Sequence, residues 1–559
     1  MTCYPEYSVL VAEGEIVHVS TQRTAKHGRR WRLIALVLCL FLSAAVVAVR
    51  LVIVRAQPIL RTRLIQTLSN RFQSKVELTS LDVSVIHGLE VSGSGLKIYG
   101  PSDPDPYESG VQALITLQEF HFHTGIRNLF RSTVHVDTVY LKGMELNMPP
   151  KESRPEFTKK MRSQARKMSF VVDRFVGEDT RLLINNSNPS KPPLEFAISN
   201  LKMKDIGPGQ PLHFDATLVN PKPVGNIQST GLFGPWQEDD PRDTPVQGDY
   251  SFSNADLGTL KGIGGILSST GRYAGTLSNI VVDGTTDTPD FRVTTSGHAV
   301  PLHTEFHAIV DGTSGDTYLS PVKAKLLHSF FTANGSVTRI PGRRGHDIEL
   351  DVVVEHAEIE DLLKAGVRTD PPVMTGPVKM RTKLSLLPGE GDVADRLHLA
   401  GNFDVQGGHF TNEKVQSRLD SLSVRTQGKG KATPENPQDP VATNLRGIFK
   451  LEDGLLSFSL LHFSIPGTQV DMAGNYSLDG RTFDFRGTAR LDAKLSQMTS
   501  GWKSILLKPV DPFFSKNGAG TQVPVKITGT QSEPHFGLDF GHKDEHKVFK
   551  KDFDSAAKH

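Results

Sequence analysis

Residues 78–100 read LTSLDVSVIHGLEVSGSGLKIYG, and this stretch sets the pattern for most of the chain. Its apolar residues alternate with polar ones, and glycines divide the run into short segments. The alternating apolar positions, with Val76 just before the stretch, are Val76, Leu78, Leu81, Val83, Val85, Leu89, Val91, Leu96 and Ile98. A period of two is typical of strands that bury one face, and glycine is common in turns. The stretch therefore predicts a meander of short antiparallel strands.

The same alternation returns along the rest of the chain. It runs through Val134, Val136, Leu141 and Leu146, and strands are expected again over much of 169–219, 245–427 and 444–540. Helical spacing is rare, and we expect helices only at Pro58–Ser74, Asn254–Leu267 and Ile359–Ala365, with residues 150–168 forming a short helix or an excursion. The sequence thus predicts a mainly β protein with a few short helices.

Breaks in composition divide the chain into regions. Residues 428–440 read GKGKATPENPQDP, a polar run with three prolines that predicts a loop or linker. The expected regions are a tail at 1–30, an apolar helix at 31–55, an N-terminal β region at 56–244, a middle β region at 245–427, a linker at 428–443, a C-terminal β region at 444–540 and a charged tail at 541–559.

A long apolar run precedes the β regions. Residues 33–49 read LIALVLCLFLSAAVVAV, and after Arg50 the run continues to Val54. A bilayer core of about 30 Å needs about 20 apolar helical residues, and an arginine near one end can extend its guanidinium to the headgroups. We therefore predict one transmembrane helix, whose anchoring residues would include Leu33, Leu36, Leu38, Leu40, Phe41, Val46, Val47, Leu51 and Ile53.

Basic residues before this run predict its orientation. Arg23, Lys26, Arg29, Arg30 and Arg32 precede it without an acidic residue among them, and fewer basic residues follow it closely. The positive-inside rule therefore favours a cytoplasmic N-terminus and an exported C-terminal body. The alternative is a cleaved signal peptide, with Ser43-Ala44-Ala45 as a small-residue cleavage site, but the apolar run is longer than the usual signal core.

Composition and motifs exclude several classes of function. The 559 residues carry a net charge of +2, which does not indicate a nucleic-acid-binding protein. The only cysteines are Cys3 and Cys39, so the exported body has no disulfide and no cysteine nucleophile, which fits a bacterial envelope protein better than an extracellular animal one.

We also find no motif of a hydrolase, a zinc protease, a nucleotide-binding loop or a calcium loop, and no cofactor is expected. His121 and His123 could face one side of a strand and bind a metal, but no third ligand is identifiable, so we expect neither a metal site nor an enzyme.

Several stretches resemble the AsmA-like family of bacterial envelope proteins. They are residues 248–291 (GDYSFSNADLGTLKGIGGILSSTGRYAGTLSNIVVDGTTDTPDF), residues 451–454 (LEDG), residues 456–491 (LSFSLLHFSIPGTQVDMAGNYSLDGRTFDFRGTARL), residues 523–530 (VPVKITGT) followed by Pro534, and the helix-to-strand entry that ends in residues 78–100. The resemblance covers most of residues 33–540. It implies a protein anchored in the inner membrane whose periplasmic body is an elongated, curved antiparallel sheet with an open groove, in a family linked to outer-membrane maintenance and phospholipid transport.

The residue pattern is consistent with such a groove. A sheet with one apolar face must cover that face, and the expected helices are too few to do so. Either the sheet folds on itself as a sandwich, or lipid tails occupy part of the face. The candidate groove residues are Val134, Val136, Leu141, Leu146, Phe458, Leu460, Phe483 and Phe485, any of which could instead be ordinary core.

Two functions therefore remain open at this stage. The first is a membrane-anchored envelope protein that binds phospholipid acyl chains in the groove and supports phospholipid transport or outer-membrane biogenesis. The second is a non-enzymatic assembly or scaffold protein that binds another envelope protein through the edges of its sheet.

Overall fold

The structure is a computed structural model of the 559-residue chain. It describes residues 43–44, 58–59, 61–70, 74–85, 88–99, 113–125, 128, 134–148, 170–185, 192–237, 239–294, 296–340, 343, 345–389, 393–427, 440–477, 482–493, 521–530 and 534–538.

The described residues form 26 strands joined in a single sheet. Its first half contains β1 (Val76–Glu77), β2 (Ser80–Ser84), β3 (Leu89–Ile98), β4 (Ile115–Thr124), β5 (Val134–Met148), β6 (Phe170–Ile184), β7 (Leu194–Ile206), β8 (Leu212–Pro221), β9 (Val224–Phe233), β10 (Pro245–Asp256), β11 (Ile263–Gly264), β12 (Ile266–Thr276) and β13 (Asn279–Val293). Its second half contains β14 (Val300–Val310), β15 (Thr317–Leu326), β16 (Ser329–Thr338), β17 (Asp347–Glu358), β18 (Met374–Thr375), β19 (Pro377–Leu386), β20 (Leu397–Phe410), β21 (Thr443–Glu452), β22 (Leu455–Ile465), β23 (Thr468–Ser477), β24 (Phe483–Leu491), β25 (Thr521–Gly529) and β26 (Pro534–Leu538).

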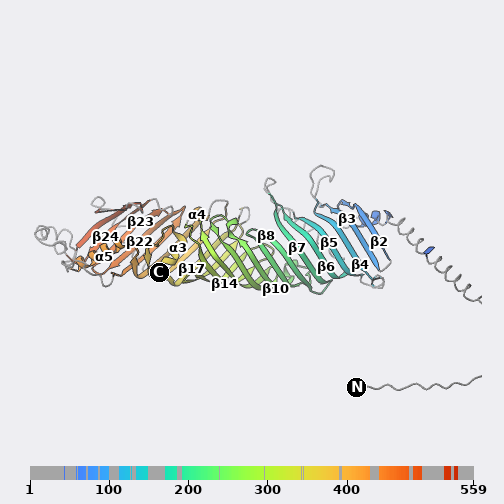
Figure 1. Ribbon diagram of the computed structural model, residues 1–559, viewed down its shortest axis with the longest axis horizontal. Coiled ribbons are helices and arrows are strands. Elements are labelled where there is room, and N and C mark those ends of the chain that lie inside the picture. Colours follow the sequence, from blue (N-terminus) through green and yellow to red (C-terminus); the bar gives the residue numbers. More distant parts are fainter. Residues whose placement is uncertain are drawn as a thin grey trace, which may run out of the picture.

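Strand order follows the chain almost without exception. From β3 to β26 each long strand pairs with the next long strand, and the short strands β11 and β18 pair with β13 and β20. All pairings are antiparallel except that of β5 with β6, which is parallel. The result is one elongated ribbon of strands that lie across its long axis (Figure 1). The mainly β, elongated and antiparallel fold expected for the body is therefore confirmed.

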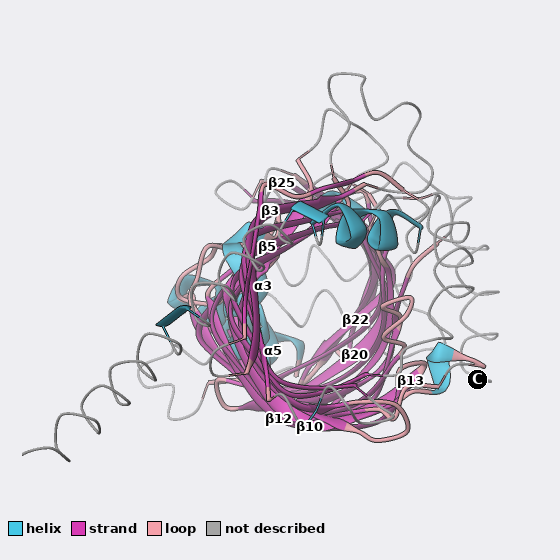
Figure 2. Ribbon diagram, turned by 90° about the vertical axis from the view of Figure 1, so that its right-hand side faces the viewer, coloured by secondary structure: helices cyan, strands magenta, loops and turns pink. Residues whose placement is uncertain are grey.

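The ribbon is also strongly curved. Viewed end-on, the strands bend around the long axis of the molecule (Figure 2). Register shifts interrupt many of the pairings, for example between Phe252 and Ala255 in β10 and between Phe458 and Leu461 in β22. Such bulges bend a strand and increase its twist, which lets a wide sheet coil instead of lying flat.

Short helices follow the ends of a few strands. They are α3 (Ile359–Gly366), α4 (Val393–Arg396) and α5 (Glu413–Thr426), with 3₁₀ turns η3 (Pro241–Asp243) and η4 (Leu257–Thr259). The helix expected at Ile359–Ala365 is confirmed as α3. Helix α5 was not expected from the sequence, and its N-cap is Asn412, whose side chain accepts hydrogen bonds from the N–H groups of Lys414 and Val415.

The helix expected at Asn254–Leu267 is wrong. Strand β10 continues to Asp256, one 3₁₀ turn follows, and β11 and β12 occupy the rest of the segment. The three-residue spacing of Leu257, Leu260 and Ile263 suggested a helix, but Gly262, Gly264 and Gly265 disfavour one, and Gly262 and Gly265 have positive φ angles.

Two buried clusters mark the best-packed parts of the sheet. The first contains Leu78, Leu81, Leu117, Phe120, Val139, Leu141 and Val172. Residues 61–70 are helical, in the segment where we expected a connector helix, and Leu64 and Ile65 pack against this cluster. The second cluster lies beside α3 and contains Val354, Ala357, Met374, Val378 and Val405.

The predicted transmembrane helix lies outside the described residues, apart from Ser43 and Ala44, which are helical. Within the described part of the chain, no helix has the length and apolar character needed to cross a bilayer. The segment at 150–168, the tails at 1–30 and 541–559, and residues 428–439 of the expected linker also lie outside it.

Candidate functional site

The strand register sorts the side chains of the sheet into two faces. Residues directly opposite each other on neighbouring strands share a face, and successive residues alternate. One set of directly opposed residues across β8, β9, β10, β12, β13 and β14 is Phe214, Gly231, Gly248, Tyr273, Val282 and Ala308. The neighbouring set, on the other face, is Asp215, Thr230, Asp249, Arg272, Asp283 and His307. In these rows, therefore, one face is mainly apolar and the other is mainly polar and charged.

Burial indicates which face is concave. In β12, Gly271 and Tyr273 are partly buried, whereas Thr270, Arg272 and Ala274 are exposed, and the same alternation holds over most of β9. The described residues build one sheet and no second sheet that could cover the apolar side. On a curved single layer, side chains of the concave face converge and shield one another. We therefore assign the apolar side to the concave face and call it the inner face.

Aromatic rings on the inner face lie across glycines of neighbouring strands. A Cβ added to Gly93 would stand 2.4 Å from the Phe120 ring, and one added to Gly447 would stand 2.7 Å from the Phe403 ring. Both distances are far below van der Waals contact. Each ring thus occupies the space that a side chain at the glycine would take, and it lies along the sheet. The inner face is therefore apolar, and its side chains project little from the sheet.

The N-terminal candidate residues lie along β5. Leu141 is buried in the first cluster, directly opposite Phe120, and Val136 packs against that cluster. Leu146 is partly buried opposite Ile115 of β4 and Leu182 of β6. Val134 begins β5. Leu141 and Val136 are therefore core residues beneath the 61–70 helix or next to it, and Leu146 lies farther along the strand.

The C-terminal candidates include a chain of touching phenylalanines. The ring centroids of Phe458 and Phe485 are 5.7 Å apart, and those of Phe483 and Phe485 are 6.4 Å apart. Phe458 also contacts Phe403, with centroids 6.3 Å apart and rings nearly perpendicular. Phe403 and Phe449 were not among the sequence candidates, although their alternation with polar neighbours could have identified them.

Leu460 lies on the opposite face from Phe458. The bulge in β22 leaves Ser459 without a partner, so Phe458 opposes Phe449 while Leu460 opposes Ile448, the residue just before Phe449. Simple alternation from Phe458 would place Leu460 on the inner face. The inserted residue reverses that assignment, and Leu461 takes the inner position opposite Gly447.

Two shallow hollows lie on the outer face. One, of about 660 Å³, is bordered by outward residues such as Gln247, Asp249, Arg272 and Asp283. The other, of about 600 Å³, is bordered by Ala400, Asn402, Ile448, Lys450, Ser457 and Ser459. Each hollow lies between two rows of outward side chains. Its bottom is the row between them, whose side chains point to the inner face instead. These hollows are gaps between outward side chains and lie apart from the inner face.

The outer face carries cross-strand pairs of histidine and aspartate. Nδ1 of His303 lies 2.6 Å from Asp287, and Nδ1 of His307 lies 2.7 Å from Asp283. His121 and His123 also fall on this face, and His123 lies 3.7 Å from Asp137. Within the described ranges, no group of three or more potential metal ligands occurs.

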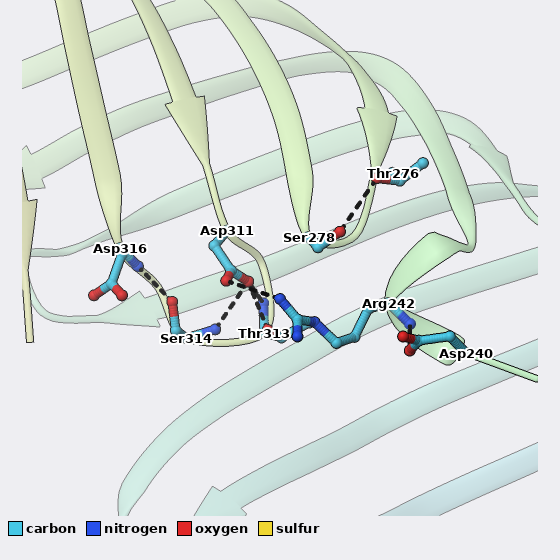
Figure 3. Close-up of polar contacts among 8 residues, drawn as sticks. All are labelled: Asp240, Arg242, Thr276, Ser278, Asp311, Thr313, Ser314 and Asp316. Atoms are coloured by element: carbon cyan, nitrogen blue, oxygen red, sulfur yellow. Dashed lines mark hydrogen bonds and ion pairs between the residues drawn. The ribbon is translucent and has the colours of Figure 1, made fainter. Parts of the chain in front are cut away.

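One tightly bonded turn lies at an edge of the ribbon, between β14 and β15 (Figure 3). The Asp311 carboxylate accepts hydrogen bonds from the N–H and hydroxyl groups of Thr313 and from the N–H of Ser314. Arg242 lies 4.0 Å from the same carboxylate. Burial alone would raise the pKa of Asp311, but the hydrogen bonds from Thr313 and Ser314 outweigh it, so the pKa is lowered.

Comparison with known proteins adds no relative, because neither the family models nor the curated proteins contain a match to this chain.

Proposed function

We propose that this protein is a non-enzymatic, membrane-anchored envelope protein that binds lipid acyl chains on the inner face of its sheet and supports phospholipid transport or outer-membrane biogenesis. The observation that carries the proposal is the inner face of a single-layered curved sheet, which is apolar over long stretches. The 61–70 helix packs on the N-terminal end of this face, and a large apolar surface that stays uncovered is typical of an interaction site.

The energetics favour hydrocarbon as the occupant. Moving a CH₂ group from water into apolar surroundings contributes about 0.8 kcal/mol, and this contribution needs no specific headgroup contact. Neighbouring strands are about 4.8 Å apart, so some two dozen strands give a face on the order of 100 Å long. Such a face could hold several acyl chains in succession. Its low relief, with rings lying over glycines, leaves room for them.

The expected location follows from the sequence. The apolar run at 33–54 would anchor the chain in a bacterial inner membrane, with the N-terminus in the cytoplasm and the sheet in the periplasm. The resemblance of residues 248–291 and 456–491 to AsmA-like proteins supports this arrangement. The run ends shortly before β1, so the sheet would begin close to the bilayer from which lipid is taken.

Two adjacent valines of β13 provide a matched test. Val282 belongs to the inner face and Val281 to the outer face, and both are partly buried. The full-length protein, purified in detergent, is mixed with fluorescent phospholipid, and bound lipid is measured for Val282→Asp and Val281→Asp. We expect Val282→Asp to lower lipid binding severalfold, because a buried carboxylate is unfavourable beside acyl chains. Val281→Asp should bind lipid as the unaltered protein does.

The alternative is an assembly protein that binds an envelope partner through its sheet edges. It would be favoured by a preparation that carries no phospholipid, takes up none, and retains a stable protein partner in both valine variants. That result would remove the lipid-binding proposal.

A further inference from the structure

Two tyrosines on the inner face, in the middle of the sheet, are each bonded to a serine on another strand. The hydroxyl oxygen of Tyr273 lies 2.7 Å from Oγ of Ser229, and that of Tyr250 lies 3.1 Å from Oγ of Ser269. Ser229 stands directly opposite Tyr250, so the two pairs interlock across β9, β10 and β12. We call these four residues the tyrosine clasp.

Hydroxyl-bearing side chains continue on the inner face of the next two strands. Thr286 of β13 stands opposite Ser269, and its Oγ1 lies 2.7 Å from Oγ1 of Thr304 in β14. The inner face elsewhere differs. Phe120 and Leu141 line it toward the N-terminal end, and Phe403, Phe449 and Phe458 line it toward the C-terminal end. The clasp is thus a polar segment between two apolar ones.

The hydroxyl hydrogens of the clasp determine which ligand groups it can still bind. The Ser229 hydroxyl donates to the carbonyl of Asp249 at 3.0 Å, and the Ser269 hydroxyl donates to the carbonyl of Thr285 at 2.9 Å. A serine hydroxyl has one hydrogen, so when that hydrogen bonds the carbonyl, the tyrosine is the donor to its serine. Among the residues that the structure describes, no donor is directed at either phenolic oxygen. In this arrangement the phenolic oxygens are free to accept hydrogen bonds, whereas the hydroxyl hydrogens of the clasp are already used.

The tyrosine rings are also held in place. A Cβ on Gly271 would lie 2.8 Å from the Tyr250 ring, and one on Gly284 would lie 2.7 Å from the Tyr250 hydroxyl oxygen. Tyr273 covers Gly248 in the same way, because a Cβ added to Gly248 would lie 2.9 Å from Cζ of Tyr273. Each ring spans neighbouring strands and is fixed at its hydroxyl by a serine. The acceptor oxygens are consequently positioned before a ligand arrives.

We propose that the tyrosine clasp binds the headgroup of a lipid that carries N–H or O–H donors, with the acyl chains lying on the apolar segments beside it. This inference rests on the proposed function, because it assigns a headgroup site within the acyl-binding face. The shared chemistry is hydrogen-bond donation to the phenolic oxygens. An ethanolamine headgroup offers N–H donors and a glycerol headgroup offers O–H donors, whereas a choline headgroup offers neither.

The test compares three phospholipids with identical acyl chains. The full-length protein is incubated with vesicles of phosphatidylethanolamine, phosphatidylglycerol and phosphatidylcholine in equal amounts, recovered, and its bound lipid is identified by mass spectrometry. We expect each donor-bearing lipid to exceed phosphatidylcholine by at least about two- to tenfold, the range that a single neutral hydrogen bond gives. The double variant Tyr250→Phe and Tyr273→Phe should bind all three equally while keeping total uptake.

Tyr318→Phe is the matched control. Tyr318 is exposed on the outer face, opposite Ile309, so the same chemical change there should leave the preference intact. Equal binding of the three lipids by the unaltered protein would overturn the clasp proposal alone, whether or not the double variant folds. A preference that persists in a folded double variant would also overturn it. Failure to take up any lipid would instead overturn the proposed function.

Discussion

The hydroxyl of Ser329 donates a 2.8 Å hydrogen bond to the carboxylate of Asp361, and both side chains are buried. The same carboxylate oxygen accepts a 2.9 Å bond from the N–H of His328. Oγ of Ser329 in turn accepts a 3.0 Å bond from the N–H of Glu358. These bonds join α3 to the turn between β15 and β16 and to the end of β17, so they fix the helix on the edge of the sheet.

Replacing Asp361 should therefore destabilise this part of the protein. Asp361→Ala leaves the His328 N–H and the Ser329 hydroxyl without their acceptor, and a buried unsatisfied polar group costs about 1–3 kcal/mol. We expect the free energy of unfolding of the full-length protein, measured by chemical denaturation, to fall by about this amount. Exposed Glu355→Ala, on the neighbouring strand, is the control. Equal stability of the two variants would contradict the role given to Asp361.

A side chain at Gly284 should displace residues of the inner face. Its added Cβ would stand 2.7 Å from the Tyr250 hydroxyl oxygen and 2.9 Å from the Phe306 ring. Gly284→Val should push these rings off the sheet, lower stability by about 1–3 kcal/mol and reduce lipid uptake. Gly366→Ala, where an added Cβ meets nothing within 4 Å, should change neither quantity. Unchanged uptake by Gly284→Val would show that ring position does not limit lipid binding.

The Asp311 turn should make stability depend on pH in the acid range. Because its pKa is lower in the folded protein than in the unfolded chain, the ionised carboxylate stabilises the fold above the unfolded pKa of about 3.9. That contribution should be lost as the pH falls through the folded pKa. Asp311→Asn should flatten this part of the acid-unfolding profile, whereas exposed Asp215→Asn should affect it less. Identical profiles for the two variants would remove the effect assigned to the turn.

Phe458 should matter more than its neighbour Leu460. Phe458 contacts Phe403 and Phe485, and aromatic pairs contribute about 0.5–1.5 kcal/mol each beyond their burial. We expect Phe458→Ala to destabilise the protein by about 1–3 kcal/mol and to lower lipid uptake. Leu460→Ala, on the outer face, should leave uptake unchanged. Loss of uptake in both variants would contradict the face assignment made from the bulge.

Alternation of residue type was enough to predict the β-rich body, because one buried face imposes a period of two on every strand. Residues 78–100 show this directly, as β2 and β3 with Leu81, Val83, Leu89 and Val91 at the expected spacing. The same rule fails at bulges. One unpaired residue at Ser459 moves Leu460 to the other face, and nothing in the local sequence marks that residue as an insertion.

Long-range relationships were not accessible to the sequence. The tyrosine clasp joins residues 44 and 19 positions apart, and the glycines under the rings belong to other strands than the rings themselves.

The order of elements along the chain also repeats. A long strand, a short helical segment, a two-residue strand and another long strand occur at β10 to β12 and again at β17 to β19. Ala255 and Ala357 are buried at equivalent points, but the segments after them differ in length, which hides the repeat.

Photo-crosslinking tests the central claim most directly. The full-length protein would be loaded with a phospholipid that carries a photoreactive group in its acyl chain, irradiated, digested and mapped by mass spectrometry. We expect crosslinks at inner-face residues such as Val282 and Phe306. Crosslinks confined to outer-face residues such as Val281 and Ile309, or an absence of crosslinks anywhere in the sheet, would contradict the assignment of the inner face as the lipid-binding surface.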